Sequence, residues 1–395
     1  LLLGIDAKAR IFIIFLSAIV PVVINAYTGI QRTPQNYIHV GQSLGMSRWR
    51  IFTRICIPYA LPTLFTGVRL SLSTAWAALV AAEMMASVRG LGYMIQMGRL
   101  LIKPDIIITG MFTIGCTGAL LSVVLTMLEK RLTKWGSEMK NTVSQGGREP
   151  RWWKVLPVLS ILIFLFAWQL IALCNPEMFP TPAQTAVSLV KMLMPASGTS
   201  VLVHVWASLR RVLIAYVIAC VIGIFLGILF GWSRICYDYV HPVFELLRPI
   251  PPIAWIPLII MWFGVGETAK IAICFIGCFV PLVLNTLFGV SSLDPTYLKA
   301  ARVLGAGRRA LLLEIVLPGI FPSILAGMKV ALSSGWVCVI AAEMIAAREG
   351  LGYLIIRSME TGNMLNILVA LIFIGSISAL LSALFSKMEK VVCPW

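Results

Sequence analysis

Long apolar stretches separated by short polar segments occupy almost the whole chain. Each is near the length of about 20 apolar residues that crosses a bilayer, and they lie at about 11–30, 62–86, 106–128, 155–174, 206–231, 249–263, 271–290, 322–346 and 366–388. The runs are continuous rather than alternating, which favours helices over a transmembrane barrel. The pattern predicts an all-α, polytopic transmembrane helical bundle, in which 249–263, short and interrupted by proline, has the least defined limits.

The chain contains an internal duplication. A shift of 260 residues aligns 1–135 with 261–395 without a gap, and 15 of the 36 positions in 58–93 and 318–353 are identical. The identities include Pro58/Pro318, Gly67/Gly327, Trp76/Trp336, Glu83/Glu343 and the runs Gly90-Leu91-Gly92-Tyr93 and Gly350-Leu351-Gly352-Tyr353. Identity over so many helical turns indicates two copies of one unit.

The duplication divides the chain into three parts. Residues 1–133 hold the last three spans of a first unit, 134–152 form a polar, glycine-containing linker, and 153–395 form a complete six-span second unit. Three spans before the linker and six after it make the copies parallel, related by an axis along the membrane normal. Because the chain begins at Leu1 and not at Met, we expect a fragment that lacks the start of the first unit.

Composition supports the membrane interpretation. Only 12% of the 395 residues are charged, against about 25% in a typical soluble protein. The net charge of +16 is explained by basic segments on the cytoplasmic side, most densely within 130–154, so no nucleic-acid partner is expected. The nine cysteines are scattered through apolar runs without metal or redox spacing, and we expect no metal site and no cofactor.

A polar segment between two spans of the second copy carries a distinctive pattern. Asp294-Pro295 favours a helix start, Gly305 and Gly307 break the helix, and a second helical run, 308–316, ends at Pro318. The first copy repeats this shape in residues 37–62, with Gly45 at the bend and Pro58 at the exit. An ordinary basic loop explains the charge, but not the same helix, bend and proline in both copies.

Both segments resemble the coupling loop of ABC-importer permeases, whose pattern is Glu-Ala-Ala, three residues, Gly, nine residues and Ile-x-Leu-Pro. The second copy matches with Ala300, Ala301, Gly305, Ile315, Leu317 and Pro318, and departs from the pattern with Lys299 at the glutamate position. The first copy matches less well, mainly at Gly45 and Pro58. The resemblance implies a permease of the bacterial-type inner membrane whose partners are lipid, cytoplasmic ABC ATPase subunits and an extracytoplasmic solute-binding protein.

Three further stretches resemble importers of nitrate, sulfonate, taurine and bicarbonate. They are 247–270, 339–355 and 80–95, and they imply that the solute is a small anion. Related members carry pyrimidine precursors of thiamine, and that alternative stays open.

Polar residues within the apolar spans are candidates for the transport pathway. Glu83 and Glu343 lie near the outer end of the fifth span of each copy, where a carboxylate is costly and faces a cavity or a partner. The alternative is a structural role, in which each glutamate hydrogen-bonds the Gly-Leu-Gly-Tyr turn that follows it.

Helical spacing brings further residues onto these spans. Ser73 and Trp76 share one face, as do Ser333 and Trp336, and lining of the pathway and helix packing both remain open for them. Arg69 and Lys329 lie near the cytoplasmic end and either reach the interface or attract an anion. Arg210 and Arg211 begin a span on the outer side, where we expect them to anchor at the lipid headgroups.

Other classes of protein fit less well. No Gly-x-x-x-x-Gly-Lys-Ser/Thr loop occurs in the sequence, so ATP hydrolysis is expected from separate subunits and the chain is not expected to be an enzyme. An ion-coupled secondary transporter favours inverted repeats and relays of acidic or histidine residues. A membrane enzyme would need paired carboxylates, a metal-spaced cluster or a nucleophile motif, and none is recognisable in the sequence.

Overall fold

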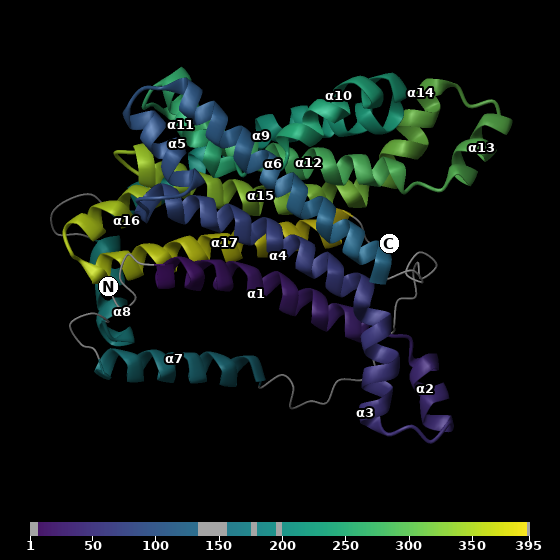
Figure 1. The fold of residues 1–395 in the computed structure, drawn as a ribbon, viewed down its shortest axis with the longest axis horizontal. Helices are drawn as coiled ribbons and strands as arrows, with labels where there is room; N and C mark the ends of the chain where they lie inside the picture. The colour runs from purple at the N-terminus through teal and green to yellow at the C-terminus, as the bar shows by residue number, and fades with distance from the viewer. Residues whose placement is uncertain (1–6, 133–155, 175–179, 195–199, 393–395) are drawn as a thin grey trace. The chain divides into compact units, whose positions relative to one another are not determined.

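A computed structural model describes residues 7–132, 156–174, 180–194 and 200–392 (Figure 1). No strand occurs in those ranges, and seven helices there are long and apolar enough to cross a membrane. The predicted all-α transmembrane bundle is therefore confirmed. The predicted linker, 134–152, lies outside the described residues.

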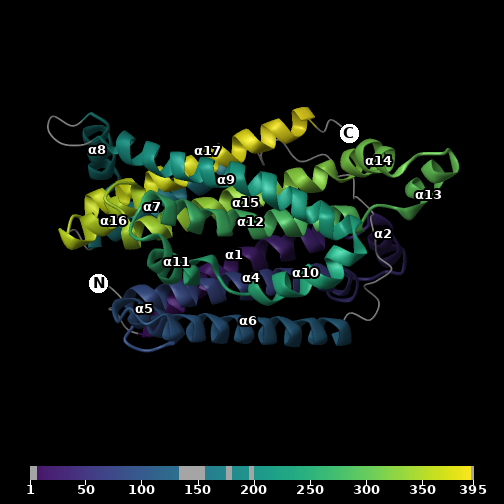
Figure 2. The same cartoon turned by 90° about the horizontal axis from the view of Figure 1, so that it is seen from above.

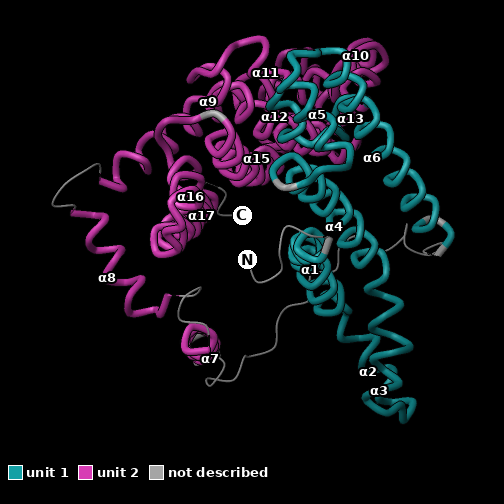
Figure 3. The backbone as a smooth tube through the Cα atoms, turned by 60° about the vertical axis from the view of Figure 1, so that its left-hand side comes forward, with its two compact units in different colours: residues 1–155, 246–257 teal, residues 156–245, 258–395 magenta. Residues whose placement is uncertain are grey.

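The described chain divides into two compact units, coloured in Figure 3: residues 1–155 with 246–257, and residues 156–245 with 258–395. Unit 1 contains α1 (Ala7–Gln31), α2 (Gln35–Ser43), α3 (Arg48–Ile51), the π-helical turn η1 (Phe52–Cys56), α4 (Ile57–Ala86), α5 (Leu91–Leu100), α6 (Pro104–Leu132) and the 3₁₀ turn η3 (Pro252–Trp255).

Unit 2 contains a longer series of helices. They are α7 (Leu156–Cys174), α8 (Pro182–Leu193), α9 (Val201–Trp232), most of α10 (Arg234–Leu247) and of α11 (Ile256–Phe263), α12 (Glu267–Ser291), α13 (Pro295–Val303), α14 (Arg308–Ala310), the π-helical turn η4 (Leu311–Val316), α15 (Leu317–Ala346), α16 (Leu351–Glu360) and α17 (Met364–Val392).

The order of elements repeats as the sequence predicts. The series α1 to α6 is followed helix by helix in α12 to α17, so that Ala7–Gln31 corresponds to Glu267–Ser291 and Pro104–Leu132 to Met364–Val392. In each unit the short helices after the first of these spans lie at one end and the short helix after the next span lies at the other end (Figures 1 and 2).

One of the nine predicted spans, 249–263, differs from a simple crossing helix. The apolar stretch predicted at 155–174 contains one helix, α7, over Leu156–Cys174. The proline-interrupted stretch 249–263 is one arm of a bent pair, Arg234–Leu247 and Pro252–Phe263, that turns through 86°. The sequence pattern missed the first arm because α10 is amphipathic and carries charged residues, so no continuous apolar run marks it.

The core of unit 2 is the packing of α9, α12 and α15. Small residues let the backbones approach closely: a Cβ on Gly227 of α9 would lie 2.6 Å from the Cβ of Thr286, and one on Gly223 would lie 2.9 Å from the Cβ of Leu282. In unit 1, α1 packs on α4 in the same way, with Ser71 Oγ donating a 2.6 Å hydrogen bond to the carbonyl of Ala18.

Candidate functional site

The segment between α12 and α15 forms a helix, a bend and a second helix. The Asp294 carboxylate caps α13 by accepting a 2.8 Å hydrogen bond from the backbone N–H of Thr296. The chain then turns at Gly305, whose φ of +84° lies in the region that favours glycine. We name residues 294–318 loop B.

The first copy builds the same shape in residues 34–58, which we name loop A. Helix α2 begins after Pro34 without a side-chain cap, and the bend lies at Gly45, with φ +69°. Ser47 then caps α3 by accepting a hydrogen bond of 3.4 Å from the N–H of Arg50. The positions of the two bends match the sequence prediction.

The exit from each loop differs from the prediction. The second helical run does not end at Pro318, because α14 continues through the π-helical turn η4 into α15, giving one long helical segment, Arg308–Ile345. Proline has no N–H to donate and its ring clashes with the carbonyl four residues earlier. A wider π turn relieves that clash, and η1 does the same before Pro58.

Loop B exposes apolar side chains although its charge marks it as lying outside the bilayer. Val303 and Leu304 are each 87% exposed, and exposed Arg302, Arg308 and Arg309 flank them. Lys299 and Ala300 face outward, while Ala301 is buried at 9%. Exposed apolar residues with a basic rim are typical of a surface that binds another protein.

Loop A carries the same kind of surface. Leu44, at the position of Leu304, is 74% exposed, and Trp49, at the position of Arg309, is 72% exposed. Tyr37 and Tyr297 also occupy equivalent positions and are exposed in both loops. The apolar character is thus repeated even where the residues of the two copies differ.

The Asp294 cap gives a prediction for loop B. Asp294→Ala removes the only side-chain cap of α13, so the first amides of α13 should exchange with solvent faster, toward the behaviour of uncapped α2. The hydrogen bonds from Thr296 lower the pKa of the Asp294 carboxylate. A lowered pKa means that the stabilisation is present above the unfolded pKa of about 4 and is lost as the pH falls through the lower folded value.

Hydrogen exchange measured by mass spectrometry and corrected for intrinsic rates checks both parts. Protection of the first turn of α13 that is unchanged in Asp294→Ala, or that does not depend on pH below about 4 in the parent, would contradict the prediction.

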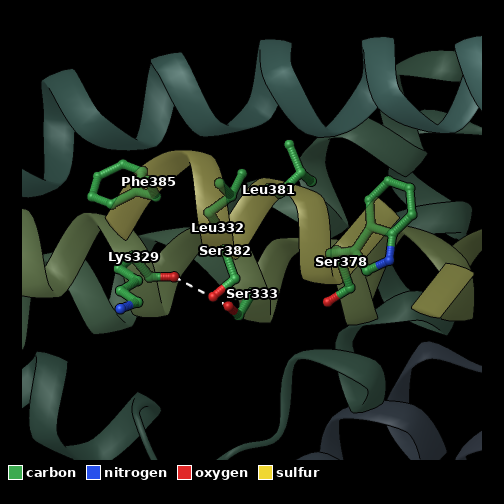
Figure 4. A pocket seen from close by; sticks show the side chains of 8 residues that line it. Lys329, Leu332, Ser333, Ser378, Leu381, Ser382 and Phe385 are labelled. Atoms are coloured by element: carbon green, nitrogen blue, oxygen red, sulfur yellow. Dashed lines mark hydrogen bonds between the residues drawn. The ribbon is translucent and has the colours of Figure 1, made fainter. Parts of the chain in front are cut away.

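Two of the three predicted pathway residues of the second copy line a small cavity between α15 and α17 (Figure 4). Ser333 and Trp336 line it together with Lys329, Ser378 and Ser382, and its volume of about 10 Å³ is room for about one water molecule. Ser333 Oγ donates 3.2 Å to the carbonyl of Lys329. The Lys329 ammonium donates to Ser386 Oγ at 2.8 Å.

The first copy places the equivalent residues on α4. Ser73 donates to the carbonyl of Arg69 at 3.2 Å, and Arg69 pairs with Glu129 of α6, as Lys329 does with Glu389 of α17 at 3.9 Å. The Trp76 indole N–H is buried and has no hydrogen-bond partner in the described part of the chain, whereas that of Trp336 donates to the carbonyl of Ile374 at 3.2 Å.

Glu343 lies away from that cavity, in a buried polar cluster near the outer end of the α9–α12–α15 core. Its carboxylate accepts hydrogen bonds from Ser208 Oγ at 2.8 Å and from the N–H of Gly352 at 3.0 Å. The Arg211 Nη1 lies 2.6 Å from its Oε1, and neither side chain is exposed. The glutamate therefore holds the start of α16 and pairs with an arginine of α9.

Arg211, on α9, connects to α12, to α15 and to the turn before α16 in unit 2. Its Nε and Nη2 bind the two carboxylate oxygens of Glu267, at the start of α12, at 2.7 and 2.8 Å. It also donates to the carbonyl of Glu349 at 2.9 Å. Nearby, the N–H of Gly350 donates to Nδ1 of His204 at 3.1 Å. The expectation that Arg211 anchors at the lipid headgroups is wrong. Its guanidinium can be buried because each of its three nitrogens donates a hydrogen bond to an acceptor.

Glu83, the equivalent of Glu343, keeps one of these interactions. Its Oε2 accepts a 2.9 Å hydrogen bond from the N–H of Gly92. Among the residues that the structure describes, no cation lies within ion-pair distance of its carboxylate. The turn before α5 is thus built like the turn before α16, without the arginine.

Comparison with known proteins decides the class of transporter. Residues 5–135 and 219–394 match the family described as "binding-protein-dependent transport system inner membrane component". The chain belongs to this family. The two matched segments fit the tandem copies, and the chain is accordingly a multi-pass inner-membrane transport permease, as the loops predicted.

Relatives within the family extend the comparison. An ABC transporter permease protein of Methanocaldococcus jannaschii is 36% identical over 244 residues, which are 61% of this chain and 90% of the relative. The taurine transport system permease protein TauC of Escherichia coli is 34% identical over 245 residues, 61% of this chain and 89% of the relative. The nitrate import permease protein NrtB of Synechocystis is 30% identical over 246 residues, with 61% and 90% covered.

The sequence alone did not show that Arg211 lies at the centre of this buried polar cluster. Arg211 lies 132 residues from its partner Glu343, and its position near the start of an apolar run is also typical of an interfacial anchor. The available signal was the spacing of Arg211 from His204 and Ser208, which are seven and three residues before it and so share its helical face.

Proposed function

We propose that this permease imports a small anion with energy from separate ABC ATPase subunits, which bind loops A and B. The observation that carries this proposal is the repeated apolar tip, with Leu44 and Leu304 at 74% and 87% exposure on short helices bent at a glycine of positive φ. When an exposed leucine on a basic, polar loop enters a cleft of a partner, its apolar surface is removed from water, which favours binding.

In this proposal, nucleotide binding and solute binding are carried out mainly by separate partner proteins. The sequence holds no phosphate-binding loop of the Gly-Lys-Ser/Thr type, so nucleotide acts through the ATPase subunits. A permease moves solute by changing between states, and the difference in ATPase binding to those states supplies the energy. Affinity for the solute comes mainly from an extracytoplasmic binding protein, in keeping with the family description.

The class of solute is proposed from the relatives. Taurine and nitrate, named in TauC and NrtB, both present negatively charged oxygens to their surroundings. Beside Ser333 and Trp336, Lys329 supplies a cation and Ser378 and Ser382 supply hydroxyl groups along α15 and α17, which is suitable chemistry for such oxygens. We place Ser73 and Trp76 of α4 on the same pathway, by the repeat. Glu83 and Glu343 act as supports of the adjoining turns.

Replacing the bend glycine tests the coupling. Gly305→Leu puts a side chain at a φ of +84°, a backbone strain of about 1–2 kcal/mol that reorients the tip of loop B. We expect a roughly tenfold or larger loss of ATP hydrolysis stimulated by loaded binding protein. The measurement is ATPase activity of the assembled transporter in nanodiscs.

Gly307→Leu is the matched control. Gly307 lies two residues away and has a φ of −72°, and a Cβ at either glycine meets no atom within 4 Å. Stimulation should survive in Gly307→Leu. Equal stimulation of the two variants and the parent would remove loop B from the coupling.

A further inference from the structure

Helix α8 and the start of α17 line a groove at the end of unit 2 that also carries α16 (Figures 1 and 2). The groove has a volume of about 460 Å³, within the range of about 300–1,000 Å³ that small-molecule sites occupy in proteins. Loop B lies at the opposite end of unit 2. Because the basic loops mark the cytoplasmic side, the groove lies on the outer side of the membrane.

The lining of this groove carries positive charge. Its polar side chains are those of one lysine and four neutral residues: Lys191, Gln184, Ser188, Asn363 and Asn366. The other lining residues are apolar, so among the described residues no carboxylate lines the groove. The first turns of two helices, α8 and α17, meet there, and helix N-termini add partial positive charge.

Helix capping leaves two amides of the lining as hydrogen-bond donors. Gln184 belongs to the capping box of α8, in which its Oε1 accepts a 2.9 Å hydrogen bond from the N–H of Thr181. Before α17, the Oδ1 of Asn363 accepts a 3.1 Å hydrogen bond from the N–H of Asn366. Since both amide oxygens are engaged within the protein, the NH₂ group of each side chain is left to donate to a ligand.

Two further side chains of the groove have no partner in the part of the chain that the structure describes. There, no carboxylate lies within ion-pair distance of the Lys191 ammonium. Asn366 uses its backbone N–H in a hydrogen bond, but not its side-chain amide. The groove therefore offers a cation and several unused donors to whatever enters it.

The turn into α17 does not depend on its two asparagines. In the first copy, Lys103 and Ile106 occupy the places of Asn363 and Asn366. The backbone of the turn is nevertheless the same, because the N–H of Lys103 and that of Asn363 each donate to the carbonyl five residues earlier, at 2.8 and 2.9 Å. The side-chain amide of Asn366 is thus not needed to form the turn and is available to a ligand.

We propose that the groove between α8 and α17 binds an oxyanion, such as a phosphate or sulfonate group, at the outer surface of the permease. The Lys191 ammonium supplies the charge, and the amide and hydroxyl groups of the lining donate hydrogen bonds to the oxygens. Two sources present this chemistry there: the headgroup of an outer-leaflet phospholipid and a dissolved anion. The inference does not depend on ATPase coupling, and only the dissolved source bears on the proposed solute.

Photo-labelling of the full chain in nanodiscs tests the site and separates the two sources. One probe is a water-soluble aryl azide with a sulfonate group, and the other is a phosphatidylglycerol with an aryl azide on its headgroup. An uncharged aryl azide alcohol measures non-specific labelling. Mass spectrometry should find label within 183–191 or 363–366 from at least one charged probe. The probe that labels identifies the source as dissolved anion or lipid headgroup.

Substitutions identify the groups that bind the anion. Lys191→Gln should lower labelling about tenfold or more, because a hydrogen bond to a charged group is lost, whereas Lys191→Arg should retain most of it. Asn366→Ile introduces the first copy's residue and should lower labelling about threefold or more. Arg357→Gln is the matched control: Arg357 is an exposed cation of α16 paired with Glu360 at 3.6 Å, and labelling should be unchanged.

Two results would overturn the proposal. One is labelling of the groove by the charged probes that does not exceed labelling by the uncharged alcohol. The other is equal labelling of Lys191→Gln and the parent, which would mean that the groove attracts the aryl group and not the anion. Neither result bears on stimulated ATP hydrolysis in Gly305→Leu, so this proposal and the proposed function can fail separately.

Discussion

Arg211→Met should lower the free energy of unfolding of unit 2 more than any substitution on the exposed surface of α9. The arginine is fully buried, and its loss leaves the equally buried Glu343 without a counter-charge. Removing one partner of a buried ion pair costs about 3–5 kcal/mol. Unfolding of the purified chain in mixed micelles, followed by circular dichroism, measures the change.

The neighbouring arginine provides the control. Arg210 is 48% exposed and reaches Glu267 only at 3.5 Å, so Arg210→Met should cost about 0–1 kcal/mol. Adding Glu343→Leu to Arg211→Met should recover part of the stability, because a pair replaced by apolar residues leaves no buried charge behind. Similar losses for the two arginines would show that the cluster around Arg211 does not hold unit 2 together.

Gly350→Ala should be the second most damaging change. Gly350 has φ 123° and ψ 166°, a region that is almost restricted to glycine, and a Cβ there would collide with the Glu343 carboxylate. Backbone strain and overpacking each cost about 1–3 kcal/mol, so we expect a total loss of about 2–6 kcal/mol. Hydrogen exchange should also show faster opening of the first turn of α16.

Gly362→Ala separates the two causes. Gly362 also has a positive φ, +66°, but a Cβ at this position meets no atom within 4 Å. Its replacement should cost only the backbone part, about 1–2 kcal/mol. If the two alanine variants lose the same stability, the contact between the turn and Glu343 contributes nothing. Gly90, with φ 123° beside Glu83, should behave like Gly350.

Most of the fold was predictable because the sequence contains two copies of the same unit. The 260-residue repeat correctly placed the helices, and the bends at Gly45 and Gly305 follow from residue types that break helices wherever they occur. The π-helical turns before Pro58 and Pro318 were not predictable, since a proline after a helical run usually marks its end. The residues around a proline do not determine whether the preceding turn becomes π-helical or the helix ends.

The polar cluster could be predicted only in part. Glu343 was recognised as costly in an apolar helix, and a bond to the following turn was one of its two interpretations; the structure shows such a bond to Gly352. Its pairing with Arg211 needed the packing of α9 against α15, and an apolar run without a strong periodic pattern does not reveal which face meets a neighbour.

The helix runs without a break from Arg308 to Ile345, so the two ends of this segment are linked by continuous helix. At 1.5 Å per residue, 38 residues make a rod of about 57 Å, longer than the hydrocarbon layer it crosses. One end of the rod carries the tip of loop B, and the other is fixed by Arg211 and Gly352 through Glu343. We propose that this rod acts as a lever: a tilt about its middle moves its two ends in opposite directions, and a push on the tip of loop B reaches the turn before α16 in one step.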